Sequence, residues 1–287
     1  MKTSNWILAL LLGCGIQIGA YEEVYSDEIY SCPEEMCAYS NETCESVCED
    51  ACESCCGGHY IFAGPELYHL KREKEGGTHQ SGGVLGIRLG YDRIKRCKFY
   101  WGGDFFYGAG TLNGKSAAGS KIRSKYQEGN VEGRIGYTLA QKTGYCFGVT
   151  PFVGVGYAIE KNDFVSPSPL HVNFRINYSY VPVGFYSKVN VAPCFDLGLN
   201  FKAKFMIEGK NRVTRDPDFG ETSTLVKPKI HYRLELPLTY HYREEIFVSL
   251  VPFYEYRIFG GHAGFPFDFV ETKLRLWGAA ARVFYCF

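Results

Sequence analysis

The sequence lacks a long hydrophobic run after its first twenty residues. No later stretch approaches the roughly 18 consecutive apolar residues that mark a transmembrane helix. This absence excludes a helical membrane protein. The apolar run from Trp6 to about Leu12 is also too short, because a helix needs roughly 20 such residues to cross a bilayer.

That early run matches a secretory signal peptide, because Lys2 precedes it and small residues follow it. We expect cleavage after Ala20, so that residues 1–20 are removed. Lipoprotein processing is the alternative, with Cys14 as the lipidated terminus. In both cases the chain leaves the cytoplasm.

Lysine and arginine are absent from residues 21–58, which contain eleven acidic residues. Residues 59–287 hold 30 basic and 20 acidic residues, so the two regions have opposite charge. We therefore divide the chain into a signal peptide, an acidic cysteine-rich segment at 21–58 and a basic region at 59–287.

Seven cysteines crowd into the acidic segment, and in an exported chain this density favours disulfide bonds. They are Cys32, Cys37, Cys44, Cys48, Cys52, Cys55 and Cys56. The later ones recur at helical spacing, which predicts a short helix over about 42–55 with a stripe of thiols. Thiols along one helix face are poorly placed to bridge each other, so the stripe needs partners elsewhere. A few local bridges are an alternative. A metal-thiolate cluster is disfavoured because no paired CxxC arrangement and no nearby histidine is present.

The basic region shows strict alternation typical of strands. In KIHYRLELPLTYHYR, residues 229–243, apolar and aromatic side chains fall on one face and polar ones on the other. A soluble sandwich would bury the apolar face, whereas a membrane barrel would turn it to lipid. Similar alternation predicts ten strands, near residues 61–67, 85–91, 99–107, 131–137, 145–157, 174–185, 195–205, 230–242, 246–258 and 277–287. A bulge is expected at Tyr180-Val181.

The connectors between these strands alternate in length. Those near 92–97, 139–144, 188–193 and 242–245 are tight, and those near 71–82, 111–125, 159–172, 208–226 and 260–269 are long, polar and glycine-rich. This alternation is typical of an outer-membrane barrel, with turns in the periplasm and loops outside. The expected fold is all-β: a single closed antiparallel transmembrane barrel of about ten strands (8–12), with both termini periplasmic and the first and tenth strands paired.

The last strand ends on Phe287, with Tyr285 on the same face. This resembles the terminal signal that the barrel assembly machinery of bacterial outer membranes recognises. The resemblance covers the last strand and the general layout, and it implies that this machinery and outer-membrane lipid are partners of the chain.

The other face of the strands carries charges of both signs. The candidate lumen network is Arg88, Asp104, Glu132, Arg134, Lys202, Arg233, Glu235, Glu255, Arg257 and Arg282. A barrel of eight to ten strands is nearly filled by side chains, so mixed charges favour a paired, plugged interior. We expect Arg233 to pair with Glu235 or a neighbour, and Glu255 with Arg257 or Arg282. A narrow porin-like channel for ions or small solutes is the alternative.

An enzymatic function is not expected. Some barrels with this layout are surface proteases that place aspartate pairs and an Asp-His couple at the outer rim. Here Asp216-Pro217-Asp218 is better explained as a solvated turn, and His171 and His262 do not form such a couple with it. No cofactor, metal or nucleic-acid partner is expected.

Four further cysteines, Cys97, Cys146, Cys194 and Cys286, all map to the side of the short turns. With Cys14 removed the cysteines number eleven, which is odd, so at least one thiol is unpaired or bonded to another chain. The combination of export, dense cysteines and a barrel resembles the cysteine-rich, cross-linked envelope proteins of chlamydia-like bacteria. The resemblance implies a structural role in the envelope, with disulfides within the chain or to other cysteine-rich proteins. Attachment through the loops is a lesser alternative.

Overall fold

The structure is a computed structural model, and it describes residues 58–143, 145–169, 171–192, 194–218, 220–261 and 269–287. The chain divides into two units, Met1–Ser40 and Asn41–Phe287, and the strands belong to the second. The expected signal peptide, the helix at 42–55 and the first seven disulfide candidates lie outside the described residues.

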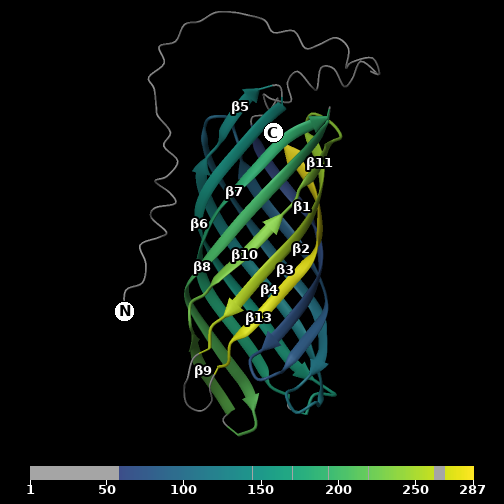
Figure 1. Cartoon of the computed structure of the whole chain (residues 1–287), viewed down its shortest axis with the longest axis vertical. Helices are drawn as coiled ribbons and strands as arrows, with labels where there is room; N and C mark the ends of the chain where they lie inside the picture. The colour runs from purple at the N-terminus through teal and green to yellow at the C-terminus, as the bar shows by residue number, and fades with distance from the viewer. Residues whose placement is uncertain (1–57, 144, 170, 193, 219, 262–268) are drawn as a thin grey trace, which may run out of the picture. The chain divides into compact units, whose positions relative to one another are not determined.

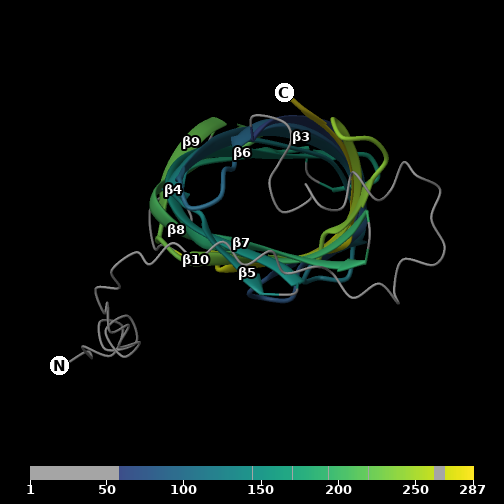
Figure 2. The ribbon, with the colours of Figure 1, turned by 90° about the horizontal axis from the view of Figure 1, so that it is seen from above.

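The described chain is all-β and forms one closed antiparallel barrel of ten strands (Figures 1 and 2). Two of the ten positions are divided into segments: β4 and β5 together form one, and β9, β10 and β11 together form another, so thirteen strand segments make up the ring. They are β1 (His59–Lys74), β2 (His79–Arg93), β3 (Phe99–Lys115), β4 (Lys121–Tyr137), β5 (Leu139–Thr143), β6 (Tyr145–Val165), β7 (Asn173–Ala192), β8 (Phe195–Asp216), β9 (Gly220–Val226), β10 (Ile230–Glu235), β11 (Leu238–His241), β12 (Ile246–Phe259) and β13 (Thr272–Cys286). No described helix is long and apolar enough to cross a membrane.

The ring closes between β1 and β13, as the sequence predicted. Their antiparallel register runs from Tyr60 opposite Cys286 to Lys74 opposite Thr272. Closure matters because strands that face hydrocarbon must pair all their backbone groups with each other. We call the end of the barrel where β1 begins and β13 ends the terminal end, and the opposite end the distal end (Figure 1).

The outer face of the terminal half is apolar. Leu67, Leu85 and Val155 are 61 %, 61 % and 68 % exposed, which a soluble protein would not tolerate around its whole circumference. Exposed aromatic residues ring the terminal end, including Tyr240 and Tyr242. The apolar face of residues 229–243 therefore points outward, and the barrel is of the transmembrane kind.

The distal half of the same strands has the opposite pattern. On β4, Ile122 and Tyr126 are buried inside the barrel, while Lys121, Arg123 and Lys125 are exposed on the outer face. The strands of 15 to 22 residues thus continue well past the 9–11 residues that span a bilayer. Most of the stretches predicted as long connectors are in fact strand, and the prediction of long loops at 71–82, 111–125, 159–172 and 208–226 was wrong.

Two irregularities interrupt the predicted strands. The stretch 229–243 divides into β10 and β11 because Pro237 has no N–H to donate to a neighbouring strand. Its carbonyl still accepts a hydrogen bond from Gly198 N (2.8 Å). The β7–β8 register shifts between Ser179 and Tyr180, but the residue it passes over is Ile207 of β8, so the irregularity lies on the strand next to the one where the bulge at Tyr180-Val181 was predicted.

Candidate functional site: the barrel interior

The interior of the barrel collects all ten residues of the candidate lumen network. Alternation along each strand points them inward, and all but one are less than 10 % exposed. The exception is Lys202, whose side chain is 13 % exposed. Charges this deep require partners, because an unpaired buried ion is costly.

Arg134 organises the β2–β4 side of the interior. Its guanidinium donates to Glu132 (2.9 Å), to the phenol oxygen of Tyr100 (3.1 Å) and, through a short contact, to Asp104. A longer contact of 3.3 Å reaches Asp92. The remaining acceptor oxygen of Glu132 binds Tyr180, while Lys202 shares the oxygen that Arg134 contacts.

Arg88 connects this group to the opposite side. It donates to Asp104 (2.5 Å) and to Glu66 (3.0 Å). Glu66 also accepts from Arg233 (3.0 Å), which in turn donates to Glu235 (2.8 Å). The bridge therefore passes from β3 through β2 and β1 to β10.

Glu255 is the most heavily paired carboxylate. It is fully buried and accepts hydrogen bonds from Arg233 (3.0 Å), Lys204 (2.9 Å) and Arg257 (2.8 Å). Arg257 continues the chain of contacts to Glu160 (2.8 Å) and Glu128. Of the expected pairs, Arg233–Glu235 and Glu255–Arg257 are present, while Arg282 pairs with Glu235 (3.0 Å).

These contacts join into one continuous ion-pair network across the barrel. Its members are Glu66, Arg88, Asp92, Asp104, Glu128, Glu132, Arg134, Glu160, Lys202, Lys204, Arg233, Glu235, Glu255, Arg257 and Arg282. The network is satisfied by cross-strand partners, which ties distant strands to one another. Two donors, Arg233 Nη2 and Arg282 Nε, have no hydrogen-bond partner among the described residues.

A packed apolar core fills the distal half of the interior. Sequence reasoning expected a polar interior throughout and did not predict this core. Its buried members are Tyr68, Leu70, Val84, Phe106, Leu112, Tyr126, Ala158, Ile176, Tyr178, Tyr180, Met206, Val226, Phe253, Phe259, Phe269, Leu274 and Leu276. Leu70, Leu112, Phe259 and Leu274 are fully buried, so this half is filled like the centre of a soluble protein.

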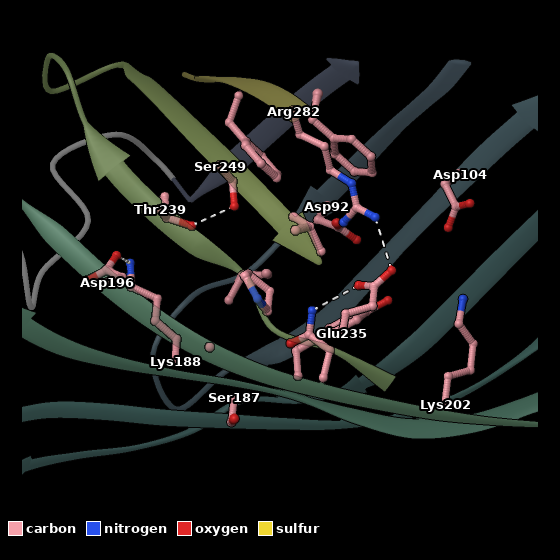
Figure 3. A pocket seen from close by; sticks show the side chains of 18 of the residues that line it. Asp92, Asp104, Ser187, Lys188, Asp196, Lys202, Glu235, Thr239, Ser249 and Arg282 are labelled. Carbon is pink, nitrogen blue, oxygen red and sulfur yellow. Dashed lines mark hydrogen bonds and ion pairs between the residues drawn. The ribbon is translucent and has the colours of Figure 1, made fainter. Parts of the chain in front are cut away.

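The terminal half contains a cavity of about 190 Å³ that is lined by both charged and apolar side chains (Figure 3). Lys188 and Asp196 line one side, and Asp104 and Lys202 line the other. An ion pair between Arg282 and Glu235 lies between them. At roughly 30 Å³ for each water molecule, the cavity could hold several waters. The ion-pair network forms its distal wall.

Of the residues considered for catalysis, His171 lies two residues before β7 and Asp216 ends β8, and the last described pair between these strands at this end is Asn173 with Thr214. Asp216 lies at the end of β8, and its carboxylate accepts a hydrogen bond from the backbone N–H of Asp218 (3.0 Å), as in an Asx turn. His171 is exposed, and His262 lies outside the described residues. Among the described residues no three metal-ligating side chains form a cluster.

The four later cysteines lie at the terminal end. Cys97 and Cys194 occupy the turns before β3 and before β8, Cys146 is the second residue of β6, and Cys286 ends β13. Cys97 is exposed, whereas Cys194 and Cys286 are buried.

The carboxyl-terminal aromatic residues face outward at the same end. Tyr285 and Phe287 are 43 % and 55 % exposed, and their rings stack at 6.3 Å between centroids. The backbone N–H of Phe287 donates to His59 O (3.0 Å). The last residue is thus fixed against the first strand.

Comparison with known proteins gives the fold alone. The chain is similar in structure to the outer membrane protease OmpT from Escherichia coli, with a TM-score of 0.52 and 11 % identity, over 79 % of this chain and 97 % of that one. It also matches the translocator domain of the autotransporter NalP from Neisseria meningitidis, with a TM-score of 0.44 and 12 % identity, over 85 % of this chain and 93 % of that one. No family model and no curated protein matches the sequence.

Proposed function

We propose that this chain is a structural barrel of the bacterial outer membrane whose interior does not conduct. The strongest support is that two different sets of side chains fill the interior, one after the other along the barrel axis. The apolar core occupies the distal half, and the ion-pair network crosses the middle. A solute that entered the terminal cavity would meet the network and then the core.

We propose in addition that the terminal end faces the periplasm. Connections are short at both ends, as at 94–98 and 75–78, but at the distal end the strands continue past the apolar outer surface, and β8 and β9 form a hairpin that extends the sheet (Figure 1). This asymmetry is the one expected of outer-membrane barrels. Both ends of the mature chain would then lie in the periplasm, beside the acidic segment.

The cysteines at the terminal end are proposed to form disulfides, within the chain or to other cysteine-rich envelope proteins. Cys97 and Cys194 have φ angles of 50° and 61°. These values lie in the left-handed region, which residues other than glycine and asparagine rarely adopt. Glycine would fit these turns without strain. A cysteine at two such positions supports a chemical role for the thiols.

Non-reducing electrophoresis tests the disulfide role. Cells are lysed in N-ethylmaleimide, which blocks free thiols, and the barrel is followed with and without reductant. We expect high oligomers or a faster, cross-linked monomer that disappears on reduction. The variant Cys97→Ser/Cys194→Ser/Cys286→Ser should lose that species. Identical migration in both lanes, with every thiol alkylated, would contradict the proposal.

A further inference from the structure

Three cations on the outer face lie directly opposite one another on adjacent strands. In the register of the sheet Lys161 of β6 faces Arg175 of β7, and Arg175 faces Arg212 of β8. The flanking residues Asn162 and Asn211 are buried inside, so the three side chains point outward. Directly opposed residues have Cβ atoms about 5 Å apart, and like charges at this spacing repel each other.

The charges around this row compensate it only in part. Arg212 pairs with Glu221 of β9, and Arg175 donates to the amide oxygen of Asn177 (3.1 Å). In the described part of the chain Lys161 and Arg175 have no carboxylate within 4.0 Å. Two other acids are on this face: Asp163 lies opposite Lys125, and Glu208 lies opposite Ser179. Lys210, opposite Asn177, adds a further exposed cation. We call Lys161, Arg175, Lys210 and Arg212 the basic row.

The basic row lies just beyond the apolar outer surface. On β6 the next outward residues towards the terminal end are Ile159 and Tyr157, and on β8 Lys210 and Glu208 come between Arg212 and the exposed Ile207 and Phe205. Outward positions along a strand recur every two residues, or roughly 6.6 Å. The headgroup region of a bilayer is roughly 5–8 Å deep on each side, so the row lies at headgroup depth.

We propose that the basic row binds the phosphate of a membrane lipid in the leaflet around the distal end. An anionic oxygen between opposed cations removes their repulsion, and arginine can bind a phosphate through two parallel hydrogen bonds. The apolar surface below accommodates the acyl chains. This site lies on the outside of the barrel and does not depend on the proposed structural role or on the sealed interior.

Native mass spectrometry of the whole barrel in a neutral detergent tests this proposal. The probes are dioleoyl phosphatidic acid, dioleoyl phosphatidylcholine and inorganic phosphate. We expect the wild type to retain phosphatidic acid about 10-fold more than phosphatidylcholine. The variant Lys161→Gln/Arg175→Gln/Arg212→Gln should lose this preference.

A matched control removes three cations at the β1–β13 seam: Lys71→Gln/Lys273→Gln/Arg275→Gln. These cations also lie on the outer face, but each contacts Glu73 or Glu271. The control should keep the preference.

Equal loss in both variants, or no loss in either, would overturn the proposal, as would full displacement of the lipid by inorganic phosphate. Heat-modifiable migration on gels verifies folding. If the triple variant does not fold, Arg175→Gln alone is used, and wild-type retention by it would also overturn the proposal.

Discussion

At the scale of single residues, the interior depends on the pairing of buried charges. Glu255 is fully buried and forms ion pairs with three cations, so its removal should destabilise the network more than removal of another carboxylate. Replacing a whole buried network by apolar residues is often neutral, whereas removing one partner leaves charges uncompensated. The interior should therefore respond much more strongly to single changes than the surface does.

Glu255→Gln should destabilise the folded barrel by about 3–5 kcal/mol. The substitution removes the negative charge that Arg233, Lys204 and Arg257 share, and it leaves their buried positive charges without that partner. Glu73→Gln is the control, since Glu73 also contacts two cations but is partly exposed, and it should cost at most about 1 kcal/mol. Equilibrium unfolding in urea with detergent measures both. Equal stability of the two variants would contradict the assigned role of the network.

Sequence reasoning could find ten network residues because strand alternation places them on the polar face. It missed Glu128 and Glu160 because both fall beyond the apolar outer surface: Glu160 lies in the predicted connector 159–172, and Glu128 lies between the predicted connector 111–125 and the predicted strand 131–137. Glu66 was missed for another reason. Its strand has apolar residues on both faces, such as Ile61 and Phe62, which hides the alternation. Pairing partners also depend on the register between strands, which a single sequence does not give.

At the scale of elements, each strand changes character along its length. The terminal half turns apolar residues outward, and the distal half turns them inward, as on β4. The number and order of the strands could be predicted because the terminal halves follow one clear pattern. The distal halves could not, because their reversed pattern with polar outer residues is similar to a polar loop.

The seam between β1 and β13 leaves no room for a side chain at Gly64. A Cβ atom there would lie 1.8 Å from the carbonyl oxygen of Ala281. Gly64→Ala should therefore push the two strands apart and cost at least about 1–3 kcal/mol. Gly133 on β4 has open space around it, so Gly133→Ala should be neutral or slightly stabilising.

Heat-modifiable migration on gels compares these two variants by the temperature at which the folded band disappears. A clear fall for Gly64→Ala with no fall for Gly133→Ala is expected. If both variants kept the wild-type temperature, close contact at the β1–β13 seam would not be what closes the ring.

At the scale of the whole molecule, the barrel combines a membrane exterior with a filled interior. The apolar outer face and ring closure fit a bilayer, while the core fills the distal half of the interior and the ion-pair network crosses its middle. The closed barrel follows from sequence alternation and from the need to pair every backbone group. The filled distal half depends on the strands continuing past the apolar outer surface with their apolar residues turned inward, which the sequence pattern did not predict.

Conductance in planar bilayers is the most direct test of the sealed interior. The purified barrel is inserted at known density, verified by a fluorescent label, and current is recorded at fixed voltage. A sealed interior predicts no current steps above the leak of the bare bilayer. Reproducible unitary steps from the wild-type barrel would show a continuous aqueous path and would contradict it.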